Sequence, residues 1–521
     1  MGIEARPAAR DLAVTPNDNA APVTTDRASV TEAIKASYEA VRYTSRPCPT
    51  TTPARMATVA RLMGLDAPDP STAAVLEIGC GDGGNIVPMA AAAPQGRYAG
   101  VDLSPSAIAE ARAMASDLAL SNVDLDAGDL RDLRSGIGTF DYIIAHGFYS
   151  WVPADVRDAL FATLRERLAP GGIAFVSHNT MPGCALRGIA WSLLRPHVAH
   201  TDDHAHRIAE ARSMAALMAD AMADQPGLAA ALSVEFRDVV DRHDSLVLHD
   251  DLAVVNHPVF LREIAAHAAT HGLEWLADAD PYRHPAPAYG EQMNGWLAAA
   301  DRLTREHVVD HLRLRRYRES LFVHRAKGVG APIAAERLEP MHVAASSVTA
   351  ERHGSASRTQ AAADRTPAGV QRLVLDRLVA VHPASVPVSE VVSWITAHSA
   401  PGSTLAVPGN ALRLLLNACL VGAIVPLAWP VTVAHTAGST PRAFAPARWQ
   451  APRRDFVVNL RHESVVFTDP VQRRLLPLVD GTRTRDALAA ALADIAPGGA
   501  DPRRLLDGHL DHFARIGLLE T

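Results

Sequence analysis

Residues Ala74–Asn85 (AVLEIGCGDGGN) constrain the fold of this chain more than any other stretch. A short apolar run leads into clustered glycines, and a helical pattern begins after them. This order is typical of a β-strand that passes into a helix around a ligand. Glycines suit such a loop because a residue without Cβ lets the backbone turn tightly and approach a ligand closely. The stretch therefore predicts a ligand-binding strand, loop and helix.

Strand and helix patterns alternate through the residues that follow. Strands are predicted at 74–78, 98–102, 123–127, 140–145 and 173–177. Strands separated by helices run parallel, so we expect an α/β fold with a Rossmann-like, doubly wound sheet. Ligands of such sheets bind at the carboxyl ends of the strands. This rule selects the loops 77–84, 102–103, 129–130, 145–151 and 177–180.

The glycine loop has a literal match to the dinucleotide-binding fingerprint. Gly79, Gly81 and Gly84 have the spacing GxGxxG, and Asp102 stands near the place of a ribose-binding acid. A lone fingerprint of this kind is weak evidence for a dinucleotide. The charges around the loop have to decide between ligands.

Acidic residues in the loop disfavour a phosphate-bearing ligand. Glu77 stands at the entrance of the loop and Asp82 inside it, with no basic residue in 74–93. A pyrophosphate is held by free N–H groups at a helix N-terminus. Like charges in a partly desolvated site cost on the order of several kcal/mol. S-adenosylmethionine carries a sulfonium and an ammonium but no phosphate, so this pattern favours it.

These residues resemble the signature of the class I S-adenosylmethionine-dependent methyltransferases. The pattern is Glu77-x-Gly79-x-Gly81-x-Gly83, followed by Asp102 and Asp129. The resemblance implies that the glycine loop passes under the methionine part of the cofactor. It also implies that Asp102 holds the ribose hydroxyls and that Asp129 accepts from the adenine amine. Cofactor contacts are expected from Tyr43, Glu77, Gly79, Cys80, Gly81, Asp82, Gly83, Asn85, Asp102, Leu103, Asp129, Leu130 and His146.

Longer strings resemble bacterial methyltransferases that carry a methyltransferase regulatory domain. They include YTSRP at 43–47, HGFYSWVP at 146–153, SHNTMPG at 177–183 and NHPVF at 256–260. Within that group, the rickettsial protein lysine methyltransferases have a similar multi-domain plan. His178 stands where an aromatic residue is expected from the resemblance, which leaves the methyl acceptor open.

Candidate catalytic residues follow the fourth and fifth predicted strands. Methyl transfer is an in-line displacement that depends on alignment, and an amine acceptor must also lose a proton. His146 and His178 are candidate bases, and Tyr149 could shape the pocket. Substrate contacts are expected from Trp151, Asn179 and Tyr38. The cysteines have no metal-binding spacing, so no metal is predicted.

The chain divides into six predicted segments. They are a disordered N-terminus (1–29), a methyltransferase domain with an N-terminal lid (30–200), a mainly helical regulatory domain (201–330), a linker (331–368), a winged-helix-like module (369–450) and a second small helical module of the same kind (451–521). The C-terminal modules are expected to recognise a protein or to form a homodimer.

Charge and hydropathy argue against two classes of partner, nucleic acids and membranes. The net charge is −7, and residues 451–521 contain ten arginines against ten acidic residues. Nucleic-acid binding needs a basic face, so no nucleic acid is expected. The N-terminal residues have no signal-peptide core, and the uncharged run 414–434 is broken by Asn417, Gly422 and prolines. We expect no membrane span and a cytoplasmic protein.

Three functions are consistent with the sequence. The first is a methyltransferase for a side chain of a protein or peptide, with nitrogen as the expected acceptor atom and lysine as one candidate. The second is a methyltransferase for a small metabolite or natural product, with C-terminal modules that dimerise. The third is a cofactor-binding regulator without catalysis.

Overall fold

The computed structural model describes residues 27–133, 135–281, 289–325, 333–354, 365–493 and 501–521. The predicted disorder of 1–29 falls almost entirely outside these ranges. The described chain begins with α1 (Arg27–Ala40). The segment 41–48, which contains YTSRP, then has no helix or strand, in agreement with its prolines and hydroxyl residues.

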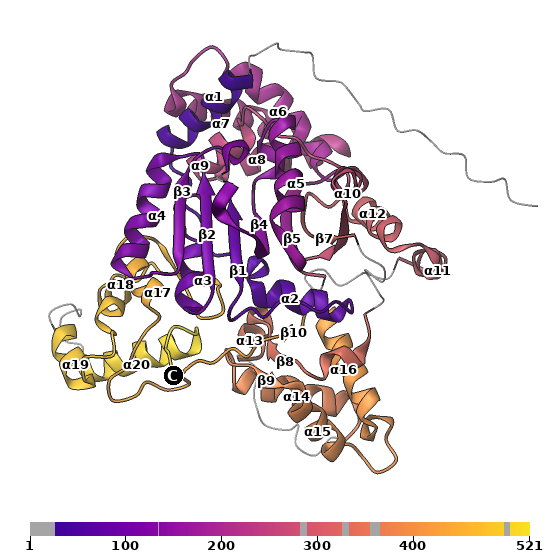
Figure 1. The fold of residues 1–521 in the computed structure, drawn as a ribbon, viewed down its shortest axis with the longest axis vertical. Coiled ribbons are helices and arrows are strands. Elements are labelled where there is room, and N and C mark those ends of the chain that lie inside the picture. The colour runs from indigo at the N-terminus through magenta and orange to yellow at the C-terminus, as the bar shows by residue number, and fades with distance from the viewer. Residues whose placement is uncertain (1–26, 134, 282–288, 326–332, 355–364, 494–500) are drawn as a thin grey trace, which may run out of the picture.

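A seven-stranded sheet forms the centre of the described part of the chain (Figure 1). Its strands are β1 (Ala74–Ile78), β2 (Arg97–Asp102), β3 (Val123–Ala127), β4 (Phe140–Ala145), β5 (Leu168–Asn179), β6 (Leu273–Asp278) and β7 (Tyr317–His324). Their order is β3-β2-β1-β4-β5-β7-β6. The first five pair in parallel, and β7 runs antiparallel to both β5 and β6. The predicted doubly wound fold is confirmed.

The last two strands come from the segment that was predicted to be a helical domain. The segment 201–330 is mostly helical, but it also contains β6 and β7, which extend the sheet beyond β5. The prediction of a mainly helical segment is confirmed, and the two strands are an addition to it. Arg318 and Glu319 interrupt the apolar pattern of β7, although both side chains are buried.

Helices cover both faces of the sheet with separate apolar cores. On one face lie α2 (Pro53–Leu62), α3 (Ile86–Ala92) and α4 (Pro105–Asp117). On the other lie α5 (Ala154–Arg167) and α10 (Leu261–Thr270). Burial on both faces explains why the parallel strands read as continuous apolar runs.

A helical cap lies above the carboxyl ends of the parallel strands (Figure 1). It contains α6 (Cys184–His197), α7 (His204–Met222) and α8 (Leu228–Asp241), which share an apolar core of their own. Figure 1 shows α1 beside this cap. The cap therefore covers the edge of the sheet at which a ligand is expected.

The predicted helices of segment 369–450 are present as α14 (Pro367–Ala380), α15 (Val388–His398) and α16 (Pro408–Leu420). They pack on a small sheet with the order β10-β8-β9, whose strands are Ile424–Leu427, His342–Ala345 and Val386–Pro387. The predicted linker 331–368 has to be corrected because it supplies β8. Strand β10 pairs antiparallel with β8.

The last segment contains a β-hairpin as well as helices. Strands β11 (Phe456–Val458) and β12 (Ser464–Val466) pair antiparallel between α17 (Ala445–Gln450) and α18 (Pro470–Leu475). Helices α19 (Arg485–Ala493) and α20 (Pro502–Arg515) complete its core. Trp449 Nε1 donates to Asp117 Oδ2 of α4 at 2.7 Å, so the C-terminal part of the chain contacts a helix that covers the central sheet.

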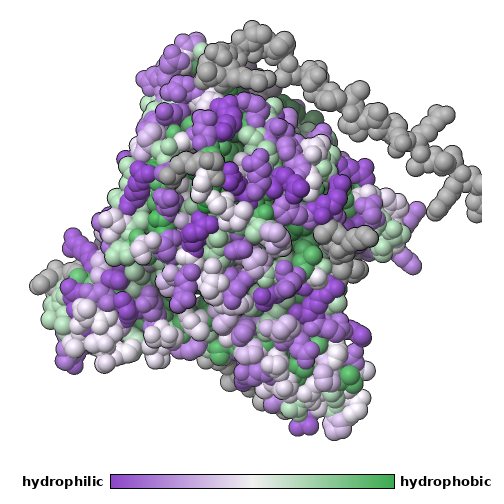
Figure 2. Space-filling model, in the orientation of Figure 1, coloured by the Kyte–Doolittle hydropathy of each residue, from purple (hydrophilic) through white to green (hydrophobic). Residues whose placement is uncertain are grey.

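The surface view in Figure 2 shows hydrophilic side chains interspersed with apolar ones over this face. Among the described helices, none is long and apolar enough to cross a membrane. The uncharged run 414–434 is divided between the end of α16 and β10, which both belong to one buried core.

Candidate functional site

A cavity of about 2050 Å³ lies at the carboxyl ends of the parallel strands. Fifteen of the residues predicted for the site line it. They are Tyr38, Tyr43, Glu77, Gly79, Cys80, Gly81, Asp82, Asn85, Asp102, Leu103, Asp129, Leu130, His146, Trp151 and Asn179. Residues from the cap and from the C-terminal segments also line the cavity, so segments far apart in the sequence form its walls.

Two predicted catalytic residues do not face this cavity. His178 is buried beside Ser320 on the other face of β5, and burial lowers the pKa of its ring to about 3. Tyr149 is buried against Phe161, and its hydroxyl bonds to His267 Nδ1 at 3.0 Å. The catalytic role predicted for both has to be corrected. The strand β5 runs to Asn179 rather than ending at Ser177, so His178 and Asn179 point to opposite faces.

Gly83 is not among the residues that line the cavity, and its predicted cofactor contact stays a prediction. Its backbone has φ = +72°, and a Cβ there would come within 2.8 Å of the Ala111 side chain on α4. The absence of a side chain lets the glycine loop pack on that helix. Gly83 therefore allows close packing between the glycine loop and α4.

The glycine loop has the conformation that a close ligand requires. Gly79 and Gly81 adopt positive φ values of +75° and +53°. A Cβ on Gly81 would meet the Ser45 hydroxyl at 2.4 Å, so the N-terminal YTSRP segment lies directly on this loop. The carboxylate of Asp102 holds the loop, because it accepts from Gly81 N at 2.9 Å. It also accepts from Ser104 N, at the start of α4, at 2.8 Å.

Glu77 offers a charge to a cationic ligand. Its Oε1 accepts from Asn85 Nδ2 at 2.7 Å, whereas its buried Oε2 has no hydrogen-bond partner among the described residues. Burial raises the pKa of Glu77 to about 7. A buried carboxylate oxygen without a partner is costly unless a ligand supplies the donor. This arrangement fits the ammonium of S-adenosylmethionine.

Asp82 has a partner that its own stretch of sequence does not reveal. Its Oδ2 forms an ion pair of 2.9 Å with Arg454, and its Oδ1 accepts from the backbone of Ser45 and Gly84. Burial raises the pKa of Asp82, while Arg454 opposes this. The charge of Asp82 is thus balanced within the protein. The electrostatic argument against a phosphate therefore rests on Glu77.

Asp129 lies at the margin of the cavity and is bound by its neighbour. Arg131 contacts its Oδ2 at 2.6 Å and holds the pKa of Asp129 below its usual range. Arg131 also pairs with Asp155 of α5 at 2.7 Å. The side chain of Leu130 is buried beside this pair. The loop after β3 is therefore fixed in position before a ligand binds.

The three expected substrate residues Tyr38, Trp151 and Asn179 all line the cavity. The ring of Tyr38 stacks on His249 with a centroid distance of 4.3 Å and an interplanar angle of 5°. Asn179 Nδ2 donates to Asn256 Oδ1 at 3.0 Å. Trp151 belongs to a short turn after β4 and lines the same space. These contacts join α1 and the end of β5 to segment 201–330.

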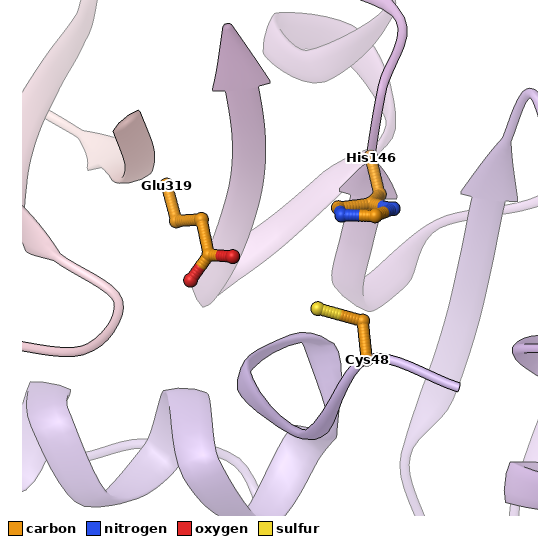
Figure 3. Close-up of side chains that lie close together, drawn as sticks. All are labelled: Cys48, His146 and Glu319. Atoms are coloured by element: carbon orange, nitrogen blue, oxygen red, sulfur yellow. The ribbon is translucent and has the colours of Figure 1, made fainter. Parts of the chain in front are cut away.

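Sequence reasoning missed an acid and a thiol that face His146 (Figure 3). One ligand atom each of Cys48, His146 and Glu319 lies within 4.8 Å of the other two. They come from the N-terminal loop, the end of β4 and β7. Burial lowers the pKa of His146 and raises that of the Cys48 thiol to about 12. No spacing along the chain indicates this cluster, because its members are far apart in sequence.

Removal of the Asp102 carboxylate is expected to abolish tight cofactor binding. Hydrogen bonds to a charged group contribute about 1.5–3 kcal/mol each, and Asp102→Ala removes one bond to Gly81 N of the glycine loop and one to Ser104 N at the start of α4. We expect S-adenosylhomocysteine to bind at least roughly 100-fold more weakly by calorimetry. Asp132→Ala, an exposed acid on the next loop, serves as the control. Unchanged affinity in Asp102→Ala would refute this assignment.

Three family models match separate parts of the chain. A methyltransferase domain matches residues 75–172, and a predicted methyltransferase regulatory domain matches 243–324. The model described as "PKMT, C-terminal winged helix domain" matches 439–500. The regulatory match includes β6 and β7, and the winged-helix match includes the β11–β12 hairpin.

The chain is similar to rickettsial proteins. It is 32% identical over 292 residues to RP789 of Rickettsia prowazekii, a match to 55% of this chain and 52% of that protein. It is 32% identical over 235 residues to RP028 of the same organism, a match to 45% of this chain and 94% of that protein. The chain thus spans about half the length of RP789 and nearly all of RP028.

A solved structure shares the whole architecture. PKMT2 from Rickettsia typhi, in complex with AdoHcy, covers 92% of this chain and 99% of its own, with a TM-score of 0.79 and 22% identity. The fold, the glycine loop and the matched models define a Rossmann-like methyltransferase with added regulatory and winged-helix segments. The chain belongs to the class I S-adenosylmethionine-dependent methyltransferases that carry a methyltransferase regulatory domain.

Proposed function

We propose that this chain transfers a methyl group from S-adenosylmethionine to a side-chain nitrogen of a protein or peptide, and that the side chain is lysine. The observation that carries the proposal is the carboxylate of Glu319, which lies beside His146 in the cavity (Figure 3). The likeness to PKMT2 of Rickettsia typhi and the matched PKMT winged-helix model support the same class of acceptor.

The chemistry of an amine acceptor explains why an acid is useful here. An ammonium group has no lone pair and must lose a proton before it attacks a methyl group. When bound, the cofactor supplies a methyl group activated by its sulfonium. A carboxylate at Glu319 attracts the ammonium and accepts its proton. His146, which burial keeps neutral, lies next to it and can carry the proton toward solvent.

The walls of the cavity suit a long cationic side chain. Tyr43, Trp151 and Tyr317 line it, and aromatic faces attract ammonium groups. Its volume of about 2050 Å³ exceeds what a cofactor-sized ligand needs, since small-molecule pockets usually measure about 300–1,000 Å³. The remaining space supports a peptide segment as the acceptor.

We assign cofactor binding to the side of the cavity formed by the glycine loop and the ends of β2 and β3. Glu77 faces the ammonium, Asp102 the ribose, and Asp129 the adenine. The unpartnered oxygen of Glu77 and the open backbone of the glycine loop support this assignment. The cap and the C-terminal segments then act as the platform for the acceptor protein.

A labelling experiment tests the proposal. The purified chain is incubated with a cell lysate and methyl-labelled cofactor, and labelled protein is hydrolysed to amino acids. We expect the label in protein, recovered as N-methyl-lysine. Label confined to small molecules would contradict the proposal and favour a metabolite acceptor. Tight cofactor binding without any label would contradict it in favour of a regulator. Asp102→Ala is the control for labelling by other enzymes in the lysate.

A further inference from the structure

A hairpin from the C-terminal segment reaches the cofactor loop. The turn between β11 and β12 carries His462, and Arg454 precedes β11. Both side chains are buried, and both residues line the cavity. Their partners are Asp82 and Asn85, which lie more than 370 positions earlier in the chain. Contact over this distance brings the C-terminal segment into the wall of the cofactor site.

Arg454 joins three separate parts of the site. Its Nη2 forms an ion pair with Asp82 Oδ2 at 2.9 Å and lies 3.4 Å from Glu110 Oε1 of α4. Its Nη1 donates to the carbonyl of Ser45 in the YTSRP segment at 3.3 Å. The side chains of Arg454 and Asp82 are only 5% and 7% exposed, so solvent screens this pair weakly.

His462 fixes the amide of Asn85. Its Nε2 lies 2.8 Å from Asn85 Oδ1, and burial lowers the pKa of His462 to about 3, so a neutral ring donates this bond. Its backbone has φ = +60°, a left-handed conformation that is uncommon for a residue other than glycine. The bond from His462 N to Asn459 O, at 2.9 Å, holds that turn.

The amide of Asn85, held by His462, in turn positions the carboxylate of Glu77. Asn85 Oδ1 also accepts from Cys48 N, and its Nδ2 donates to Thr51 Oγ1 at 3.0 Å and to Glu77 Oε1 at 2.7 Å. All hydrogen-bonding positions of this amide are thereby used. Glu77 is held by one oxygen, while the other has no hydrogen-bond partner among the described residues.

We propose that the β11–β12 hairpin is part of the cofactor site, and that Arg454 and His462 are positioning residues for the glycine loop and for Glu77. Without Arg454, the buried charge of Asp82 has no compensating cation and repels Glu77. Without His462, the amide of Asn85 loses the donor that fixes its orientation. Cofactor affinity in this chain therefore depends on a C-terminal winged-helix segment in the same polypeptide.

The test measures the binding of S-adenosylhomocysteine to the full chain by calorimetry. We expect Arg454→Met and His462→Ala each to weaken binding by roughly 10- to 100-fold, since each removes a buried hydrogen-bonded contact. At saturating cofactor the turnover number should stay within about twofold, while the KM for the cofactor rises. Arg474→Met, an exposed arginine on α18, is the matched control.

A second pair of variants separates positioning from packing. His462→Gly tolerates the left-handed turn and has no side-chain donor for Asn85, so it should weaken binding as much as His462→Ala. The combination of Asp82→Asn with Arg454→Met should be less damaging than the sum of the two. A lower melting temperature with unchanged affinity in these variants would overturn the proposal. Full additivity in the double variant would overturn it as well.

Discussion

Glu319→Gln is expected to lower the turnover number for methylation of a lysine-containing protein by roughly 10²- to 10⁴-fold, the usual contribution of a positioned general base. Glutamine keeps the shape of the side chain but neither attracts an ammonium nor accepts its proton. The affinity for S-adenosylhomocysteine should stay within about twofold, because Glu319 is placed on the acceptor side of the cavity. Single-turnover kinetics and calorimetry measure these two quantities separately.

The pH dependence of the variant gives a second readout. Free lysine has a pKa of about 10.4, so each unit of pH below that value reduces its neutral fraction about tenfold. In Glu319→Gln the acceptor must deprotonate without help, and activity should rise steeply from pH 7 to pH 9. The unmodified chain should show a flatter profile. Glu166→Gln, an exposed glutamate on α5, controls for the substitution itself.

The same cluster has the composition of a metal site, and this gives the result that would contradict the assignment. Cys48, His146 and Glu319 together offer sulfur, nitrogen and oxygen ligands. Stoichiometric zinc in the purified chain, with activity abolished by chelation and lost in Cys48→Ser, would assign Glu319 to a metal. Unaltered turnover in Glu319→Gln would equally refute its role as the base.

Local sequence was sufficient for the parts of the site that lie next to the parallel strands. The strand before the glycine loop is buried on both faces, so it reads as an apolar run, and the glycines after it have positive φ values. Asp102 ends the neighbouring strand and meets the loop because parallel strands place their carboxyl ends together. The strand, the glycine loop and Asp102 could therefore be predicted because each depends mainly on residues close to it in the sequence.

The acceptor side could not be predicted in this way because it depends on β7. That strand contains Arg318 and Glu319, and charged residues are rarely buried unless they have partners. The partners of Arg318 come from α12 (Arg302–Arg313) and β6, so tertiary contacts override the local polarity. Once β7 is placed, alternation along the strand sends Glu319 to the cavity and Arg318 to the opposite face.

The same alternation explains why His178 was misjudged. It pairs with Arg318 in the register of β5 and β7, whereas Asn179 pairs with Tyr317. Tyr317 and Asn179 both line the cavity, and His178 therefore faces the other side. Because the strand was predicted to end at residue 177, His178 was assigned to the loop that faces the cavity.

Arg454 was missed for a different reason, since nothing near Asp82 in sequence reveals an ion pair formed across the fold.

Loss of the buried Arg318 should strongly destabilise the edge of the sheet formed by β6 and β7. The side chains of Arg318 and Asp310 are both fully buried and pair at 2.8 Å. Arg318 also contacts Asp278 at 3.3 Å and Glu306 at 3.0 Å. Burial opposes the charged form, but these carboxylates hold the pKa of Arg318 above its usual range. Burial raises the pKa of Asp310 and Arg318 lowers it.

Arg318→Met is therefore expected to destabilise strands β6 and β7 by about 3–5 kcal/mol, the usual cost of breaking a buried ion pair, because only Arg315 then remains beside Asp310, at 3.3 Å, and Asp278, at 2.8 Å. The effect should grow as pH rises. In the variant, the pKa of Asp310 lies further above its unfolded value. Such a group contributes its full stability below the unfolded pKa, near 4, and loses that contribution as pH rises through the folded pKa. The deficit should be smallest near pH 4 and largest above pH 7.

Hydrogen–deuterium exchange of peptides from β6 and β7 measures this deficit locally, which avoids treating a chain with several cores as two-state. Arg325→Met, at the exposed end of β7, should leave exchange unchanged and serves as the control. Equal protection of β7 in Arg318→Met and the unmodified chain would show that Asp278 and Asp310 are stabilised by other means. Slower methylation should accompany faster exchange, because Glu319 is the next residue on the same strand and depends on its register.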